Sequence, residues 1–186
     1  MQLTGDQFTS ISAALGNDLA TLPEFPAEIR APQGTLAGVS AFQVRISDFA
    51  ITTPGDAPTV LVAMNPAALK AQLHNLVQGG AVIVNTDAFN ERNLEKAGYE
   101  SDPLEDGTLD GYRSYPVPMS QITKDAVAVH GVKPRDAERS KNFFALGLIS
   151  WMYTRPTEPT MEFISTKFRG KELVIKANEA AFQAGY

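Results

Sequence analysis

The feature that most constrains the fold is a strand–helix–strand pattern within residues 59–84. Residues 59–64 (TVLVAM) form a continuous apolar run, which is typical of a strand covered on both faces. Asn65 and Pro66 follow at once, and they are preferred residues at the N-cap and at the first position of a helix. A glycine pair ends that helix, and residues 81–84 form a second apolar run. Buried strands joined by a helix are parallel, so the pattern predicts an α/β fold with a right-handed crossover.

Apolar spacing and turn residues predict the remaining elements. The expected fold class is α/β, a three-layer sandwich with a mainly parallel, Rossmann-like sheet and a helical C-terminal third. Ser120 is expected to cap one of the helices. Strands are predicted at residues 18–25, 39–47 and 112–117, and helices at residues 5–15, 88–97, 120–129, 134–153, 171–184 and from Pro159 onward.

A stretch rich in proline and glycine, residues 23–38, leads into the strand predicted at residues 39–47. Long, proline-stiffened loops that feed a buried strand are usually functional loops or docking surfaces. Glu28 and Arg30 lie two residues apart within this charge-poor stretch. They form either a solvated ion pair or a polar anchor at an interface or ligand cleft.

Composition excludes several classes of protein. The 186 residues are 44% hydrophobic, which suffices for one ordinary core, and the net charge is −5 with no basic run, so no nucleic-acid partner is expected. The chain has no cysteine, which excludes disulfides, thiolate nucleophiles and iron–sulfur clusters held by this chain. Residues 1–10 lack the basic-then-apolar pattern of a secretory signal, so none is expected, and the longest apolar run, residues 143–153, is too short to cross a membrane. A cytoplasmic domain without a membrane partner is the expectation.

Few residues point to chemistry of this chain's own. His74 and His130 have no metal-type ligand at a recognised spacing, and the motifs of serine hydrolases, zinc proteases and P-loop enzymes are absent. Four carboxylates within residues 102–110 are expected to form a solvated loop rather than a metal site. Asn65 is the one position for which the sequence offers a physical reason to bind a ligand, because ligands gather at the carboxyl ends of parallel strands. A helix-capping role alone also explains Asn65.

The helix predicted at residues 139–153 is apolar on nearly every face, so it must be covered on more than one side. Phe143, Leu146 and Met152 extend its apolar surface beyond a single stripe. Either the helices of residues 159–184 cover them, or they dock on a neighbouring domain or a symmetry mate.

Five long runs are spread along the chain: PEFPAEIRAPQGTLAGVSAFQVRIS, PTVLVAMNPAALKAQL, GGAVIVNTDAFNERNLEKAGY, DPLEDGTLDGY and RSKNFFALGLISWMYTRPTE. In this order they resemble the gamma-type domain of 2-oxoacid:ferredoxin oxidoreductases. The resemblance is to the N-terminal part of the alpha subunit in the 2-oxoglutarate enzymes in particular, where gamma and alpha domains are fused. Several long runs in one order are far more specific than a single short motif.

The resemblance implies a role within a larger oxidoreductase complex. That complex oxidatively decarboxylates a 2-oxoacid, here expected to be 2-oxoglutarate, to an acyl-CoA, using thiamine diphosphate, magnesium, a [4Fe-4S] cluster and ferredoxin. In the family, thiamine diphosphate and the cluster lie outside the gamma domain. This chain is therefore expected to hold no cofactor and to be inactive alone. Its implied partners are the thiamine-binding domain of the alpha subunit, the beta subunit and, through the complex, ferredoxin.

The family pattern opens with an apolar strand and a G-x-S-G-D-G loop before M-Q-L-T-G, whereas this sequence starts at Met1. The first strand is therefore expected to be missing. Since the family continues into the thiamine-binding domain after the position of Tyr186, residues 1–186 are interpreted as a single gamma-type domain, a fragment of a longer alpha subunit or a shortened gene product.

The resemblance implies that a gamma domain helps to form the CoA region. The CoA-facing candidates in this chain are Gln2, Thr4, Ser40 and Asn65. The candidates for the interface with neighbouring domains are Glu28, Arg30, Phe143, Leu146 and Met152. Two alternatives remain, an independent nucleotide- or CoA-binding module and an assembly scaffold.

Overall fold

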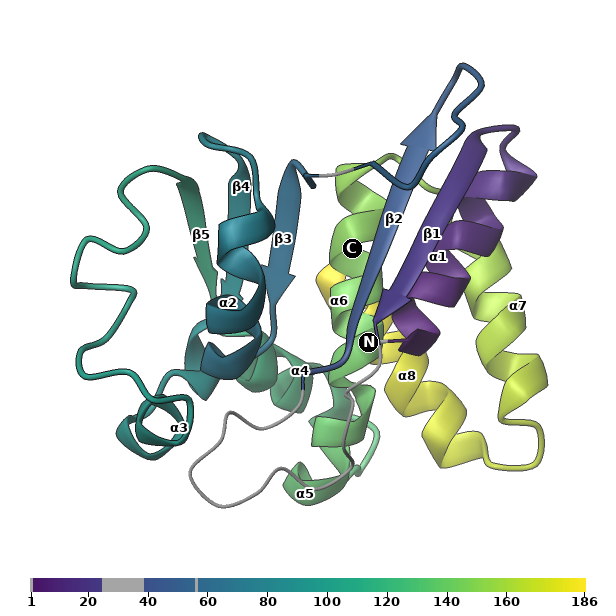
Figure 1. Cartoon of the computed structure of the whole chain (residues 1–186). Helices are drawn as coiled ribbons and strands as arrows, with labels where there is room; N and C mark the ends of the chain where they lie inside the picture. Colours follow the sequence, from purple (N-terminus) through teal and green to yellow (C-terminus); the bar gives the residue numbers. More distant parts are fainter. Residues whose placement is uncertain (1, 25–38, 56) are drawn as a thin grey trace.

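A computed structural model describes residues 2–24, 39–55 and 57–186 and arranges them as two small sheets with helices packed around them (Figure 1). The strands are β1 (Asp18–Glu24), β2 (Ala41–Ser47), β3 (Val60–Ala63), β4 (Ala81–Asn85) and β5 (Arg113–Val117). The helices are α1 (Gln2–Ala14), α2 (Pro66–Gln72), α3 (Glu91–Lys96), α4 (Met119–Ala128), α5 (Pro134–Ala137), α6 (Lys141–Met152), α7 (Glu158–Lys167) and α8 (Glu172–Gly185), with 3-10 turns η1 (Leu73–Asn75), η2 (Thr86–Ala88) and η3 (Glu138–Ser140).

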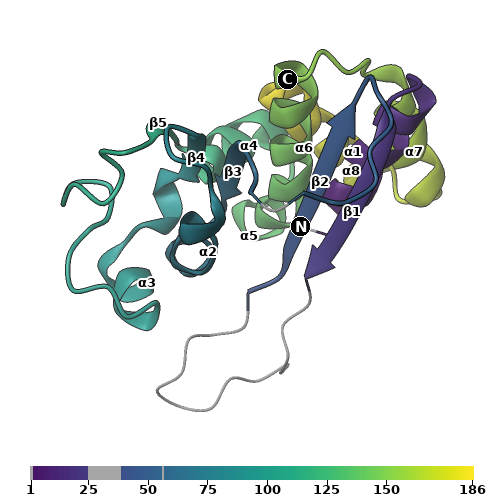
Figure 2. The same ribbon diagram turned by 45° about the horizontal axis from the view of Figure 1, so that its top comes forward.

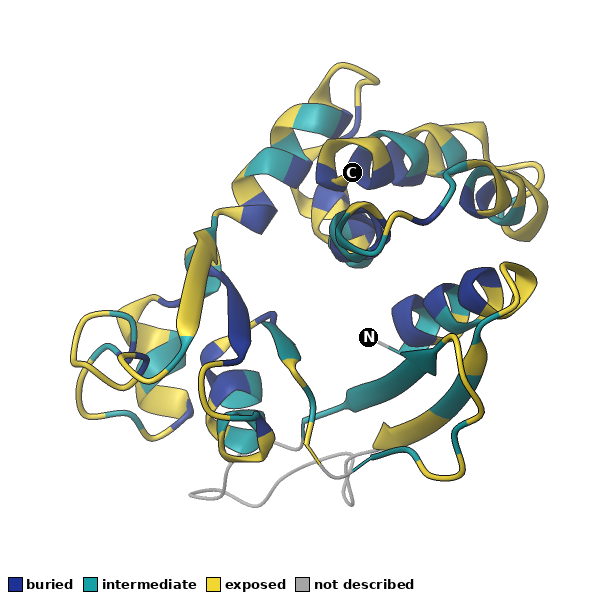
Figure 3. Cartoon of the chain, turned by 90° about the horizontal axis from the view of Figure 1, so that it is seen from above, coloured by how far each residue is buried: buried dark blue, intermediate teal, exposed yellow. Residues whose placement is uncertain are grey.

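The three strands β3, β4 and β5 form a parallel sheet in that order, as the strand–helix–strand pattern predicts. Side chains of the central strand alternate between two cores. Val82 and Val84 pack with α2, the segment after β4 and the loop before β5, whereas Ile83 packs with α4 and α6 on the opposite face. Helices therefore cover both faces of this sheet, and the predicted α/β sandwich with a parallel sheet is confirmed (Figure 3).

The strands β1 and β2 form a separate antiparallel pair, in which Leu19 lies opposite Ile46. The alternation predicted for β2 is present, because Val44 and Ile46 pack towards the helical core while Arg45 hydrogen-bonds to Thr53 at the surface. The helix α1 lies between this pair and α6 (Figure 2). Its approach to β2 requires Gly5, because a Cβ atom there would overlap the ring of Phe42.

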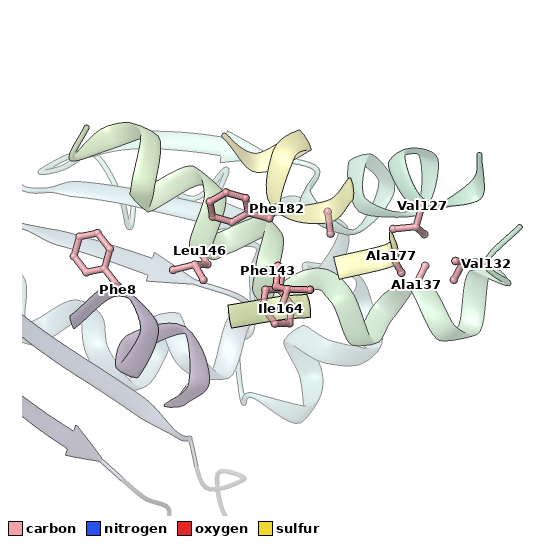
Figure 4. Close-up of a cluster of buried hydrophobic side chains, with 10 residues drawn as sticks. Phe8, Val127, Val132, Ala137, Phe143, Leu146, Ile164, Ala177 and Phe182 are labelled. Atoms are coloured by element: carbon pink, nitrogen blue, oxygen red, sulfur yellow. The ribbon is translucent and has the colours of Figure 1, made fainter. Parts of the chain in front are cut away.

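The helical C-terminal third forms its own core around α6 and α8. Phe143, Leu146, Ile164 and Phe182 are at most 3% exposed and belong to one cluster (Figure 4). The prediction that Phe143 and Leu146 form an interface with another domain is therefore wrong, since the chain's own helices cover both side chains. The half-buried Met152 packs at the edge of the core beside the parallel sheet.

Two other local predictions need correction. The helix expected over residues 134–153 consists of α5, the 3-10 turn η3 and α6 in succession. Ser120 is not the cap of α4, because Pro118 occupies the N-cap position and Ser120 is the second, buried residue of the helix. No helix within the described part of the chain combines the length and apolarity needed to cross a membrane.

Candidate functional site

A groove of about 1130 Å³ lies between β2 and β3, and it is called the β2–β3 groove below. Residues of α1, β2, β3, α2 and α6 line it. Figure 1 shows the two strands on opposite sides of α6, with their arrows pointing in opposite directions. The groove therefore separates the antiparallel pair from the parallel sheet.

The walls of the groove are mostly apolar. Phe42, Val44 and Ile46 contribute from β2, and Val60, Leu61 and Val62 from β3. Ala145 and Ile149 of α6 also line the groove. Because one edge of β3 faces this space, Val60, Leu61 and Val62 are only half-buried. These three residues are therefore less buried than the central strand β4, which is buried throughout.

Polar groups gather at one end of the groove, where β3 ends and β2 begins. The side-chain amide of Gln2 donates to the Ala41 carbonyl at 2.9 Å and to the Ser40 hydroxyl oxygen at 3.1 Å. It also donates to the Glu24 carbonyl at 3.1 Å. Gln2 thus attaches the start of α1 to the end of β1 and the start of β2, and the structure brings the candidates Gln2 and Ser40 into direct contact.

Asn65 lies at the same end of the groove, directly after β3. Its backbone is extended and its Oδ1 atom accepts a hydrogen bond of 2.8 Å from the Ala68 amide. This confirms Asn65 as the N-cap of α2, with Pro66 in the first turn. The capping bond occupies the side-chain oxygen, and the side-chain NH₂ group is the part that can contact a ligand.

Thr4 has a different role from the other three candidates. Its side chain lines the groove but is only 2% exposed, and its hydroxyl donates to the Asn142 carbonyl at 3.1 Å. This bond joins α1 to the first turn of α6. Thr4 therefore positions the helix that carries Gln2, and its hydroxyl is directed into the protein.

Asn85 is a buried polar residue that was not among the predicted site residues. It is fully buried at the carboxyl end of β4. Its Nδ2 donates to the Met64 carbonyl at 3.3 Å and to the Ser120 hydroxyl at 3.2 Å, and its Oδ1 accepts from the Ser120 amide at 3.3 Å. Asn85 thus holds the ends of β3 and β4 to the start of α4. An asparagine that ends a strongly apolar strand was the available signal.

The ion pairs nearest the groove involve Lys141, at the start of α6. Its ammonium contacts Glu138 at 2.9 Å, and Lys124 of α4 reaches the same carboxylate at 3.3 Å. Partial burial raises the pKa of Glu138, but hydrogen bonds and charge from Lys141 and Lys124 outweigh it, so the pKa lies below its usual value. Lys141 lines the groove and places positive charge close to its polar end.

The acidic loop of residues 102–110 is organised by its own hydrogen bonds. Asp106 accepts from the Ser101 hydroxyl and from the Thr108 amide, and these bonds lower its pKa. Burial, together with the nearby charge of Asp106, raises the pKa of Tyr99 to about 12. Within the described residues no group of three His, Asp or Glu side chains is placed to hold a metal ion.

These groups are suited to binding rather than to bond making. The polar end of the groove offers amide donors, a serine hydroxyl and a lysine ammonium, all of which recognise polar or anionic ligands. Among the described groove residues there is no histidine beside a hydroxyl, so the pair needed for an activated serine or threonine nucleophile is lacking.

The candidate residues are thus distributed over different places. Ser40 and Asn65 line the polar end of the groove, as does the nearly buried Thr4, whereas Gln2 contacts the groove residue Ser40 without lining the groove itself. Met152 lies at the end of α6, next to Trp151, whose side chain is 60% exposed. The candidates Glu28 and Arg30 fall outside the described residues.

Comparison with known proteins assigns the fold to a family. All of residues 1–186 match the family described as pyruvate ferredoxin/flavodoxin oxidoreductase. The chain belongs to this family. It is also 55% identical over its full length to the 2-oxoglutarate oxidoreductase subunit KorA of Mycobacterium tuberculosis, of which it spans 28%.

Solved structures show the same fold. A 2-oxoglutarate:ferredoxin oxidoreductase from Magnetococcus marinus, with 2-oxoglutarate, coenzyme A and succinyl-CoA bound, superposes with a TM-score of 0.69 at 28% identity. That match covers 97% of this chain and 27% of the other. The gamma subunit of a keto/oxoacid ferredoxin oxidoreductase from Geobacter sulfurreducens superposes with a TM-score of 0.61 at 18% identity, over 98% of this chain and 87% of the other.

The side chains of this chain suit some of the cofactors and ligands of such an oxidoreductase and not others. A [4Fe-4S] cluster requires thiolates, and the chain has no cysteine. Magnesium with a diphosphate requires carboxylate or carbonyl oxygens held close together, and the described residues contain no carboxylate cluster. The amide donors and Lys141 at the polar end of the groove do suit an anionic, hydrogen-bonding ligand such as CoA.

Proposed function

We propose that this chain is a non-catalytic gamma-type domain of a thiamine diphosphate-dependent 2-oxoglutarate:ferredoxin oxidoreductase. The observation that carries the proposal is the 55% identity to KorA along the whole chain. The complete enzyme converts 2-oxoglutarate to succinyl-CoA and passes the electrons to ferredoxin. Because this chain has no cysteine and no carboxylate cluster among its described residues, thiamine diphosphate, magnesium and the [4Fe-4S] cluster belong to other parts of the complex.

The domain has structural partners in this proposal. It forms one unit, residues 1–186, of a longer cytoplasmic alpha subunit and packs on the thiamine-binding domain, with the beta subunit and ferredoxin as further partners. Met152, beside the exposed Trp151, and the charged pair Glu28 and Arg30 are the proposed interface residues.

The polar end of the β2–β3 groove is the proposed contribution to the CoA region. Ser40 and Asn65 present hydroxyl and amide groups there, and Lys141 adds a positive charge. Gln2 contributes by holding Ser40 through its side-chain amide. CoA carries phosphates and amide groups, which these donors can bind. Thr4 supports the site indirectly, by fixing α1 to α6.

The first test is an assay of the isolated chain. Supplied with 2-oxoglutarate, CoA, thiamine diphosphate, magnesium and a redox dye, it is expected to show no turnover, whereas the complete complex is active. Dye reduction by the isolated chain would contradict the non-catalytic role.

The second test measures CoA affinity of the complete complex by calorimetry. A double variant, Ser40→Ala with Asn65→Asp, is expected to weaken CoA binding by about tenfold, because the Ser40 hydroxyl and the Asn65 NH₂ group are lost as donors and a negative charge is added while the α2 cap is kept. The matched control is Asn90→Ala, because Asn90 caps α3 in the same way, with its Oδ1 accepting from the Asn93 amide at 3.1 Å. Unchanged affinity in the double variant would remove these residues from the CoA site.

The same calorimetry separates the main alternatives. An independent nucleotide- or CoA-binding module predicts that the isolated chain binds CoA as tightly as the complex does. An assembly scaffold predicts that neither the isolated chain nor the substitutions affect CoA binding, while removal of the chain prevents assembly of the other subunits.

A further inference from the structure

Arg155 is a buried cation in the short connection between α6 and α7. At 9% exposure it is the one charged side chain that the described residues bury so deeply. Its guanidinium carbon lies 5.9 Å from the centroid of the Phe8 ring of α1, so the group is directed inward. Its Nε–H group has no hydrogen-bond partner, and none of the ion pairs among the described residues includes it. Burying a cation in this way is costly unless another group pairs with it.

Three buried hydroxyl groups on the neighbouring helices also lack a partner among the described residues. They belong to Ser12 of α1, Ser150 of α6 and Thr160 of α7, and all three residues are 0% exposed. A hydroxyl inside a helix can bond to the carbonyl one turn earlier, as Thr9 does to Gly5 at 2.8 Å. These three do not, so each keeps a donor available.

The helices α1 and α6 run side by side in a fixed register, which brings the two serines together. Thr4 donates to the Asn142 carbonyl at 3.1 Å, and these residues are 138 positions apart in the sequence. Ser12 and Ser150 have the same separation. Figure 1 shows that the two helices run in the same direction, so the serines lie together about two turns beyond the first contact.

The helix α7 brings its hydroxyl to the same place from the opposite direction. Phe8, Leu146 and Ile164 pack in one cluster (Figure 4), and each serine follows its cluster member by one turn. Thr160 precedes Ile164 by one turn, and α7 runs back along α6 after their short connection. All three hydroxyls are therefore displaced towards the end where α6 terminates. Arg155 is fixed at that end, because its backbone amide donates to the Ser150 carbonyl at 2.7 Å.

The chemistry of these groups favours an anion. A guanidinium is always charged and can only donate, and the hydroxyls can donate as well. Glu158, the nearest carboxylate in the sequence, is exposed and forms no ion pair with Arg155. A water molecule could accept from the Nε–H group but would leave the positive charge uncompensated, whereas an anion does both. Because the hydroxyls lie among closely packed helices, only a small ion fits.

We propose that Arg155 and the hydroxyls of Ser12, Ser150 and Thr160 bind a small inorganic anion, such as chloride, where α1, α6 and α7 meet. The ion ties the end of α1 to the helical core, as the bond from Thr4 ties its beginning. Chloride should therefore stabilise the fold, because it binds the folded chain and not the unfolded one. The proposal is independent of the proposed function, since it involves neither CoA nor the oxidoreductase partners.

The experiment measures the thermal midpoint of the full chain in sodium chloride, sodium bromide and sodium gluconate at equal ionic strength. Gluconate is too large for an enclosed site, so it supplies the salt without the ligand. Arg155→Gln removes the charge and the Nε–H donor. The matched control is Arg169→Gln, which removes the same charge from an exposed arginine that forms no ion pair with the described residues.

Chloride and bromide are expected to raise the midpoint of the unsubstituted chain and of Arg169→Gln by about 4 °C over gluconate, and to leave that of Arg155→Gln unchanged. A double variant, Ser12→Ala with Thr160→Val, keeps the arginine and is expected to lose most of the halide effect, which decides the matter if Arg155→Gln does not fold. The absence of a halide effect in the unsubstituted chain, or an equal effect in all variants, would overturn the proposal.

Crystals of the unsubstituted chain grown with bromide identify the ligand directly. An anomalous peak is expected within hydrogen-bond distance of the Arg155 Nε atom. Density at that position without an anomalous signal would overturn the anion site and assign these groups to an ordered water molecule.

Discussion

The two apolar sides of α6 are covered to different extents. On one side, α8 approaches so closely that a Cβ atom at Gly147 would overlap the Phe182 carbonyl oxygen, and one at Gly185 would overlap the Phe144 carbonyl oxygen. On the other side, α6 lines the β2–β3 groove and is only partly covered. We call the first contact the α6–α8 seam.

The comparison shows that an apolar helix can be tightly covered on one face and line an open groove on another. The α6–α8 seam is built from helices that lie near each other in the sequence, so short connections bring them together. The groove instead lies between β2 and β3, which belong to different sheets. Stability should therefore be concentrated at the seam and in the helical core beside it.

The largest expected effect on stability comes from the side of α6 that packs in the helical core. Leu146→Ala removes a side chain that is 1% exposed, and we expect the free energy of unfolding to fall by about 3 kcal/mol, because a cavity remains in the packed core. The matched truncation on the groove side is Val62→Ala, in the half-buried wall of the groove. We expect it to lower the free energy of unfolding by about 0.5 kcal/mol. Urea denaturation of both variants measures the two losses. Equal losses would show that the groove wall is as well packed as the core.

The seam itself is tested by Gly147→Ala. The added methyl group meets the α8 backbone rather than a movable side chain, so the helices must separate, and we expect a loss of about 2 kcal/mol despite the better helix propensity of alanine. Ser150→Ala, on the same helix, is the control. The Ser150 hydroxyl is buried and lacks a hydrogen-bond partner among the described residues, so its removal should leave stability unchanged in halide-free buffer. A stable Gly147→Ala chain would disprove the close contact.

At the polar end of the groove, Asn65→Ala removes the cap of α2 and is expected to lower stability by about 1 kcal/mol. Asn65→Ser keeps an oxygen that can accept from the Ala68 amide, so we expect it to retain most of that stability. Thermal denaturation distinguishes the two. If serine is as harmful as alanine, the side chain matters for a reason other than capping.

The smallest effect concerns pH and lies far from α6. Since the pKa of Tyr99 is raised to about 12, the unfolded chain loses this proton at lower pH than the folded chain does. The raised pKa contributes stability that is fully present below pH 10, the ordinary tyrosine value, and is lost as the pH rises towards 12. Absorbance at alkaline pH should show a late-titrating tyrosine that Tyr99→Phe removes. Tyr153, whose pKa burial also raises, should still titrate above the ordinary value in that variant.

The sequence predicted secondary structure correctly where neighbouring residues in the sequence decide it. The apolar runs before Asn65 and Asn85 became β3 and β4, and Asn65 with Pro66 began α2. Ser120 was misassigned because a serine near a helix start resembles a cap. Its hydroxyl is instead the partner of Asn85, 35 residues away in sequence, and no local pattern reports such a contact.

The sequence by itself therefore determined the order of the elements, the parallel βα pattern and the lack of thiolate chemistry, because periodicity, caps and composition are local properties. Only the tertiary structure decided how the faces of α6 are shared. It placed Phe143 and Leu146 inside the chain's own core, gave β2 and β3 only one strand partner each among the described residues, and gathered Ser40 and Asn65 at one end of the groove between them. The physical reason is that an apolar residue specifies burial but not its partner, which long-range packing selects.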